Sequence, residues 1–181
     1  CDEKLIDAAE RLVWVQIYSA GVERCLSAEQ IANGRVLLTN MQKMSSPVIA
    51  EHAIAMMLAL SRNLPQFAKG MSSGKGMMPI SGKTLLVAGL GGIGTEVARL
   101  GAALDMRVIG TRNSSREGPE FVSYVGLSHE LGDLVGEADV IVNALPLTDA
   151  THGLFGEDVF AAVKPGAIFI NVGRGKTVVT T

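Results

Sequence analysis

The sequence predicts an α/β fold with a doubly wound parallel sheet. Short apolar segments typical of strands alternate with helical patterns over much of the 181 residues, as in parallel sheets covered by helices on both faces. A G-x-G-x-x-G turn at residues 89–94 also joins an apolar strand to a helix, an arrangement that belongs to this fold class. Hydrophobic residues make up 48% of the chain, which is enough to build a substantial core.

The first part of the chain predicts a small set of short elements. In order these are the end of a helix (residues 2–11), a strand (12–18), a turn (19–21), a short helix (27–32) and a strand (36–39). The turn contains Ala20 and Gly21, whose backbone N–H groups could bind a carboxylate. An ordinary turn explains the same residues equally well.

A nearly all-apolar helix is predicted next. Ser46 fits the N-cap, Pro47 fits the first helical position, and Pro65 ends the pattern. Helices that are apolar on every side are buried between layers, domains or subunits, so we expect an interdomain or dimer element. For its polar members, Glu51 and His52, a hydrogen-bonded structural role is favoured over a functional pair.

Residues 70–82 are rich in Gly, Ser, Lys, Met and Pro, as in a surface loop and domain boundary, and a second domain is expected to begin within them, near Ile80. Its expected elements are strand 84–88, helix 93–104, strand 107–111, loop 113–119, short strand 121–125, helix 128–135, strand 139–143, helix 157–163 and strand 167–171. In such a sheet the ligand lies at the carboxyl ends of the strands. The loops to consider are therefore residues 89–94, 111–116, 144–151 and 172–176.

The glycines of the first loop fit a pyrophosphate site. Gly89 permits the tight turn, Gly91 lets the backbone approach the phosphates, and Gly94 lets helix and strand pack closely. The N–H groups at the helix N-terminus then face the anion. A turn that serves only tight packing is the alternative, and the flanking strand, helix and second strand argue against it.

The loop after the second strand carries no carboxylate where a ribose-binding Asp or Glu normally stands. It carries Arg112, Asn113, Ser114 and Arg116 instead. Because guanidinium groups bind phosphate and an acidic residue would repel it, the sequence predicts NADP, with NAD as the other candidate. A solvated basic loop without a ligand is the alternative.

Arg174 stands between Gly173 and Gly175 after the last strand. A permanently charged guanidinium there could bind a substrate carboxylate and polarise a neighbouring carbonyl. Taken alone, Arg174 fits a structural role equally well.

Composition narrows the classes of partner and compartment. The net charge of −2, without a basic run, argues against nucleic acid, and the longest apolar run falls far short of the ~20 residues that span a membrane. The two cysteines, Cys1 and Cys25, are too few for a disulfide framework and are expected to be inert in a reducing compartment. A cytoplasmic protein without a signal peptide or a metal site is expected.

Several motifs together closely resemble the D-isomer-specific 2-hydroxyacid dehydrogenases. They occur in the family's order and spacing: Ser-Ala-Gly-Val at 19–22, Asn40, Ala-Glu-His-Ala at 50–53, the glycine motif at 89–94, Leu-Pro-Leu-Thr at 145–148 with Thr151, and Asn-Val-Gly-Arg-Gly at 171–175. The resemblance implies hydride transfer between a nicotinamide cofactor, with NADPH favoured, and a small D-2-hydroxy or 2-oxo acid such as glyoxylate or hydroxypyruvate.

The same resemblance implies a domain division and a role for each matching residue. Residues 1–46 would be part of a flavodoxin-like substrate domain, 47–79 an interdomain or dimer helix and linker, and 80–181 a Rossmann dinucleotide-binding domain incomplete at its C-terminal end. Arg174 would be catalytic and would also bind substrate and cofactor, while Ala20 and Gly21 would bind the substrate carboxylate. The other implied cofactor residues are Gly89, Gly91, Gly92, Ile93, Gly94, Arg112, Asn113, Ser114, Leu145, Pro146, Thr151, Val172 and Gly173.

The chain also departs from the family pattern. The family's Glu and His acid–base pair cannot be assigned, because His52, His129 and His152 do not stand at the matching position. We therefore expect a fragment of a homodimeric enzyme. It should bind cofactor weakly and turn over poorly or not at all, because the proton donor is missing. A nicotinamide-sensing corepressor-like protein is the alternative, and Gly-Arg-Gly disfavours a generic dinucleotide-binding module.

Overall fold

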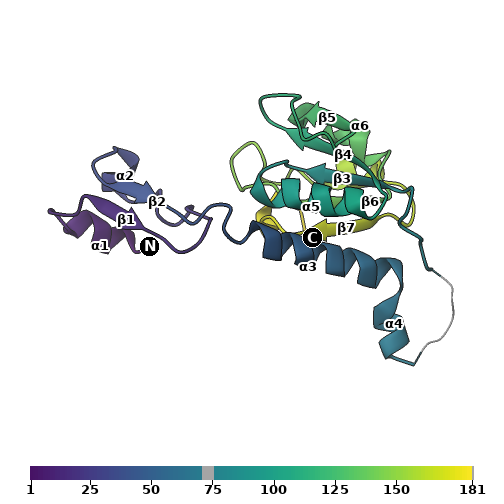
Figure 1. Cartoon of the computed structure of the whole chain (residues 1–181). Helices are drawn as coiled ribbons and strands as arrows, with labels where there is room; N and C mark the ends of the chain where they lie inside the picture. Colours follow the sequence, from purple (N-terminus) through teal and green to yellow (C-terminus); the bar gives the residue numbers. More distant parts are fainter. Residues whose placement is uncertain (71–75, 181) are drawn as a thin grey trace. The chain divides into compact units, whose positions relative to one another are not determined.

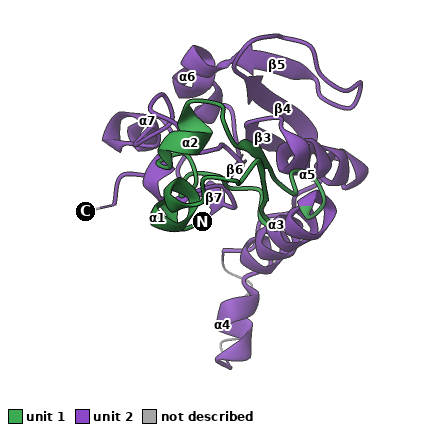
Figure 2. Ribbon diagram, turned by 90° about the vertical axis from the view of Figure 1, so that its left-hand side faces the viewer, with its two compact units in different colours: residues 1–45 green, residues 46–181 purple. Residues whose placement is uncertain are grey.

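The computed structural model describes residues 1–70 and 76–180 (Figure 1). It consists of two compact units, Cys1–Ser45 and Ser46–Thr181, which Figure 2 distinguishes by colour. Residues 71–75, in the middle of the loop expected at 70–82, lie outside the described residues.

The first unit pairs two short parallel strands with two short helices. Its elements are α1 (Glu3–Ala8), β1 (Trp14–Gln16), α2 (Glu29–Ala32) and β2 (Leu37–Thr39). The carboxylate of Asp2 caps α1 by accepting a 3.0 Å hydrogen bond from the N–H of Lys4. Gln30 of α2 donates a 2.8 Å hydrogen bond to the carbonyl of Ile6, which ties the two helices together.

Cys1 and Cys25 form a disulfide in this unit, with their Cα atoms 5.1 Å apart. The expectation that the two cysteines are inert is therefore wrong. The two residues are 24 positions apart, and they meet because α1 packs against α2, a tertiary contact that their spacing in the sequence does not reveal.

The second unit is a five-stranded parallel sheet in the order β5-β4-β3-β6-β7. Its elements are α3 (Ser46–Ser61), α4 (Leu64–Ala68), β3 (Thr84–Ala88), α5 (Gly92–Ala103), β4 (Arg107–Arg112), β5 (Tyr124–Leu127), η1 (Ser128–Glu130), α6 (Leu131–Val135), β6 (Val140–Asn143), α7 (Glu157–Ala161), β7 (Ile168–Asn171) and η2 (Gly175–Thr177). The strand order reverses direction between β3 and β6. This topology confirms the predicted doubly wound parallel sheet.

The sequences of the central strands are continuous apolar runs because both faces of the sheet are covered. Leu85 and Val87 face the cluster formed with α3 and α5, which pack side by side (Figure 1). Leu86 and Ile141 face the opposite cluster, which includes residues of α6 and the fully buried Phe155. Alternate side chains of one strand thus belong to two separate cores.

The predicted apolar helix is present as α3, but only one of its faces is buried. Met57 is fully buried against the sheet side, whereas Val48 and Leu60 are exposed. The side chains of Glu51 and His52 are also exposed, and the expected hydrogen bonds from them are not present among the described residues. Their positions on the helix turn both side chains toward solvent.

The structure differs from the elements expected from the sequence at two places, after α3 and after β4. Pro65 does not end helical structure, because Asn63 adopts a left-handed conformation (φ 55°) and a new helix, α4, begins with this proline in its first turn. The strand expected at residues 121–125 lies instead at Tyr124–Leu127. Among the described helices, none is both long and apolar enough to cross a membrane.

Candidate functional site

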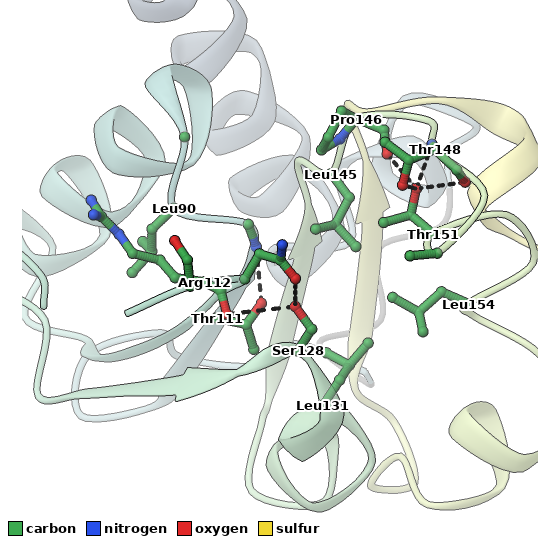
Figure 3. A pocket seen from close by; sticks show the side chains of 15 residues that line it. Leu90, Thr111, Arg112, Ser128, Leu131, Leu145, Pro146, Thr148, Thr151 and Leu154 are labelled. Carbon is green, nitrogen blue, oxygen red and sulfur yellow. Dashed lines mark hydrogen bonds between the residues drawn. The ribbon is translucent and has the colours of Figure 1, made fainter. Parts of the chain in front are cut away.

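A pocket of about 370 Å³ lies in the second unit where β3, β4 and β6 end. In Figure 3, Leu90 and Arg112 lie on one side of it, and Thr148, Thr151 and Leu154 lie on the other. Its lining residues are Gly89, Leu90, Gly91, Thr111, Arg112, Asn113, Ser114, Ser128, Leu131, Leu145, Pro146, Thr148, Ala150, Thr151 and Leu154. The pocket thus occupies the crevice where the strand order reverses, which is the ligand site of open α/β sheets.

The glycine turn after β3 is anchored to the neighbouring strand β4. Gly89 has a φ of +95°, which L side chains rarely adopt. Its N–H donates a 3.1 Å hydrogen bond to the hydroxyl of Thr111, and the N–H of Leu90 donates at 2.9 Å to the Thr111 carbonyl. Thr111 therefore holds the turn in place.

The next two glycines of the motif have opposite surroundings. A Cβ on Gly94 would overlap the carbonyl oxygen of Gly89, whereas a Cβ on Gly91 would meet no atom within 4 Å. Gly91 is the N-cap of the 12-residue helix α5, and no side chain caps that helix end. Close packing therefore requires Gly94, while the open space at Gly91 and the uncapped N–H groups fit a pyrophosphate.

Of the two arginines at the end of β4 and in the loop after it, one lines the pocket. Arg112 lines the pocket and is half-buried, and its Nε atom is buried without a hydrogen-bond partner among the described residues. Arg116 instead forms a 2.8 Å ion pair with Glu130 and donates a 2.8 Å hydrogen bond to the hydroxyl of Tyr124. No carboxylate is among the described residues that line the pocket.

Glu130 joins this loop to the end of β5. Its carboxylate accepts hydrogen bonds from the Tyr124 hydroxyl (2.6 Å) and the Leu127 N–H (2.6 Å) and pairs with Arg116. These interactions lower the pKa of Glu130 from 4.5 to about 2. Because Leu127 pairs with Arg112 in the sheet, the Glu130 carboxylate fixes backbone beside the pocket.

The low pKa of Glu130 predicts a specific loss of stability in acid. Its contribution is complete above the unfolded value of 4.5 and disappears as the pH falls through the folded value of about 2. Urea unfolding midpoints should therefore differ most between wild type and Glu130→Gln above pH 5, and the difference should shrink toward pH 2. A difference that is constant with pH would contradict this prediction.

Asp139 also contributes to the pH dependence of stability, because its pKa is lowered as well, and its contribution must be distinguished from that of Glu130. Burial raises the pKa of Asp139, but the hydrogen bond from the Thr84 N–H and the charge of Lys164 together outweigh burial, so the pKa lies below its usual value. Glu130→Gln leaves Asp139 unchanged, so the comparison with wild type isolates Glu130.

The loop after β6 is held by its threonines. The hydroxyl of Thr151 donates to the carbonyl of Pro146 (2.6 Å) and accepts from the N–H of Thr148 (2.8 Å). The N–H of Leu145 donates at 3.1 Å to the side-chain oxygen of Asn143. These bonds fix the backbone that carries Leu145 and Pro146 into the pocket wall.

Arg174 follows β7 and is not among the residues that line the pocket. Its neighbour Gly173 lies against the pocket loop, since a Cβ on Gly173 would be 2.6 Å from the carbonyl oxygen of Leu145. The half-buried Arg174 side chain donates a 3.2 Å hydrogen bond to the carbonyl of Gly173 and has a further interaction. Arg174 thus stands at the strand end next to the pocket loop.

In the first unit, the turn with Ala20 and Gly21 has its carbonyl groups engaged. Asn40 donates a 2.7 Å hydrogen bond to the Ala20 carbonyl, and the hydroxyl of Ser19 donates at 3.1 Å to that of Gly21. Within the described part of the chain, the N–H groups of Ala20 and Gly21 make no hydrogen bond. They are therefore available to bind a carboxylate.

The structure brings together eight of the predicted cofactor residues and adds seven others. The predicted residues that line the pocket are Gly89, Gly91, Arg112, Asn113, Ser114, Leu145, Pro146 and Thr151. Gly92, Ile93, Gly94, Val172, Gly173 and Arg174 do not line it. The added residues are Leu90, Thr111, Ser128, Leu131, Thr148, Ala150 and Leu154, of which Leu90 and Thr148 belong to motifs noted in the sequence. Within residues 1–70 and 76–180, no cluster of His, Cys, Asp or Glu could hold a metal ion.

The sheet order, the glycine turn and the pocket define a dinucleotide-binding domain of the Rossmann type. The model of one family, the D-isomer specific 2-hydroxyacid dehydrogenase NAD binding domain, matches residues 54–181. The chain therefore belongs to the D-isomer specific 2-hydroxyacid dehydrogenase family, as the sequence motifs indicate.

Individual relatives agree with this assignment. A glyoxylate reductase from Thermococcus onnurineus is 30% identical over 99% of this chain and 57% of its own length. A D-isomer specific 2-hydroxyacid dehydrogenase family protein from Aeromonas salmonicida has a similar structure (TM-score 0.84, 34% identity, 97% of this chain and 57% of that chain). A D-lactate dehydrogenase from Aquifex aeolicus, complexed with NAD and lactic acid, also superimposes (TM-score 0.84, 30% identity, 97% and 54% coverage). The chain spans a little over half the length of these relatives.

Proposed function

We propose that residues 1–181 are part of a longer enzyme that transfers hydride between NADPH and a small D-2-hydroxy or 2-oxo acid. The observation that carries the choice of cofactor is a pocket that presents Arg112 and contains no carboxylate among its described lining residues. Glyoxylate and hydroxypyruvate are the proposed substrates, in keeping with the relative from Thermococcus onnurineus, a glyoxylate reductase.

Arg112 supports a preference for the phosphorylated cofactor. A guanidinium group matches the geometry of a phosphate, and the buried Nε without a partner gives this side chain unused hydrogen-bonding capacity. Asn113 and Ser114 are exposed beside it and offer further polar groups to the ribose phosphate. Arg116 is excluded from this role because Glu130 and Tyr124 hold it.

The bound nicotinamide supplies the hydride, and the chain's own residues bind and orient the substrate. Arg174 would bind the 2-oxo acid and stabilise negative charge that develops on its carbonyl oxygen. The backbone N–H groups of Ala20 and Gly21 would donate hydrogen bonds to the substrate carboxylate. Gly91 and the N-terminus of α5, with Gly92 and Ile93, would hold the pyrophosphate.

The exposed apolar side chains of the long helix fit the proposal that the enzyme is a homodimer. Val48 and Leu60 of α3 and Leu64 and Phe67 of α4 are exposed, so both helices carry apolar side chains on their surfaces. A second copy of the same chain could cover such a surface.

Cofactor preference tests the proposal directly. In the longer enzyme, Arg112→Gln is expected to raise KM for NADPH about 10- to 100-fold, because a hydrogen-bonded charge contributes about 1.5–3 kcal/mol. KM for NADH should change little, since NADH lacks the 2′-phosphate.

Arg116→Gln is the matched control, because this arginine belongs to the same loop but is held by Glu130. It should leave the ratio of the two KM values unchanged. A wild-type enzyme that clearly prefers NADH would overturn the proposed preference.

A further inference from the structure

A hydrogen-bond network, buried at two of its three side chains, connects the carboxyl ends of β6 and β7. It is formed by Asn143, the last residue of β6, Asn171, the last residue of β7, and Thr177 in η2. Asn143 and Thr177 are both fully buried at 0% exposure. Buried polar groups must be hydrogen-bonded, and in a low-dielectric environment such networks fix a single arrangement of their members.

The direction of each hydrogen bond follows from the chemistry of the groups. The Asn143 side-chain oxygen accepts from the Leu145 N–H, so the amide nitrogen of Asn143 faces the Thr177 hydroxyl, 2.7 Å away. Because that nitrogen can only donate, the Thr177 hydroxyl accepts from it and must give its own proton elsewhere. The acceptor is the carbonyl oxygen of Arg174, at 2.6 Å.

The backbone on both sides of Arg174 is fixed by this network. The Arg174 carbonyl also accepts from the N–H of Thr177 (3.1 Å) and from the side-chain amide of Asn171 (3.2 Å). The side-chain oxygen of Asn171 accepts in turn from the N–H of Gly173 (2.9 Å). The peptide unit between Val172 and Gly173 and the one that follows Arg174 therefore both have partners.

The network also joins Arg174 to the wall of the pocket. The Asn143 side chain forms hydrogen bonds with both Leu145, which lines the pocket, and Thr177, whose hydroxyl donates to the Arg174 carbonyl. Gly173 and the Leu145 carbonyl are in such close contact that a Cβ on Gly173 would lie 2.6 Å from that oxygen. A shift of one loop is thus transmitted to the other.

We propose that Thr177 is a positioning residue. Through its hydrogen bonds to Asn143 and to the Arg174 carbonyl, it fixes the position of Arg174 relative to Leu145 in the pocket wall. This inference rests on the proposed catalytic role of Arg174. The Thr177 hydroxyl does not touch substrate or cofactor in this scheme and acts only by orienting the arginine. A small displacement of an orienting group can lower a reaction rate about 100-fold.

The test compares Thr177→Val, which keeps the shape of the side chain but removes the hydroxyl, with Thr177→Ser, which keeps the hydroxyl. In the longer enzyme, Thr177→Val is expected to lower kcat for 2-oxo acid reduction about 10- to 100-fold. Thr177→Ser should restore most of the rate. The Kd for NADPH, measured by fluorescence titration, should change much less than kcat, because Thr177 does not line the pocket.

A double variant separates positioning from a general structural role. If Thr177 acts through Arg174, Thr177→Val should have little further effect in an Arg174→Ala background. An equal loss in both backgrounds, or unchanged kcat in a folded Thr177→Val enzyme, would overturn the inference. Full activity of Arg174→Ala alone would instead refute the proposed catalytic role of Arg174, and a wild-type enzyme that does not reduce 2-oxo acids would refute the proposed function.

Asn171→Ala provides a second route if Thr177→Val does not fold. Asn171 is exposed, so its truncation removes the hydrogen bonds to Gly173 and Arg174 without opening a buried cavity. Its thermal unfolding should remain close to that of wild type while kcat falls. A folded Asn171→Ala enzyme with wild-type kcat would contradict the proposed positioning of Arg174.

Discussion

Replacing Arg174 with alanine is expected to lower kcat for 2-oxo acid reduction by the longer enzyme about 100- to 1,000-fold. The guanidinium group would stabilise charge that develops on the carbonyl oxygen, and that interaction is stronger in the transition state than in the ground state. Arg174 stands at the end of β7 beside the pocket loop, with its carbonyl held by Thr177 and Asn171. Steady-state kinetics with glyoxylate and hydroxypyruvate provide the measurement.

Two further variants sharpen the interpretation of that loss. Arg174→Lys keeps the positive charge but not the planar fork, so only partial recovery is expected. Lys176→Ala removes an exposed cation from the same loop and should leave kcat close to wild type. If Lys176→Ala caused as large a loss as Arg174→Ala, general electrostatic attraction of the acid would explain the effect, and a specific role for Arg174 would be refuted.

The fold could be predicted from the sequence because its signals are local. The buried run before Gly89, the glycine spacing and the helix after it specify a strand, turn and helix without reference to distant residues. The same pattern placed the pocket residues Gly89 and Gly91 and directed attention to Arg112 at the end of the next strand. Parallel α/β sheets place strand ends together, so the position of the site followed from the fold.

The remaining features depend on tertiary contacts that spacing alone does not reveal. The family resemblance selects Arg112 over Arg116, but only the structure shows that Glu130 holds Arg116. Ser128 joins the pocket because β5 lies beside β4. The disulfide between Cys1 and Cys25 likewise requires the packing of α1 on α2.

Gly91→Ala and Gly94→Ala are expected to have opposite effects, although both add one methyl group to the same motif. At Gly94 the methyl group would overlap the carbonyl oxygen of Gly89, and backbone atoms cannot move aside as a flexible side chain can. Overpacking of this kind should lower the free energy of unfolding by about 3 kcal/mol or more. Urea denaturation followed by circular dichroism measures the loss.

At Gly91 the added methyl group meets no protein atom within 4 Å, and its φ of −82° is open to alanine. Stability should therefore stay at the wild-type level. The Kd for NADPH should rise about 10- to 100-fold, because the methyl group separates the pyrophosphate from the N–H groups of α5. Hydrogen bonds to a charged group contribute about 1.5–3 kcal/mol. Fluorescence titration of NADPH measures the affinity. Unchanged affinity in Gly91→Ala would place the pyrophosphate elsewhere, and wild-type stability in Gly94→Ala would refute the close packing of α5 on the turn.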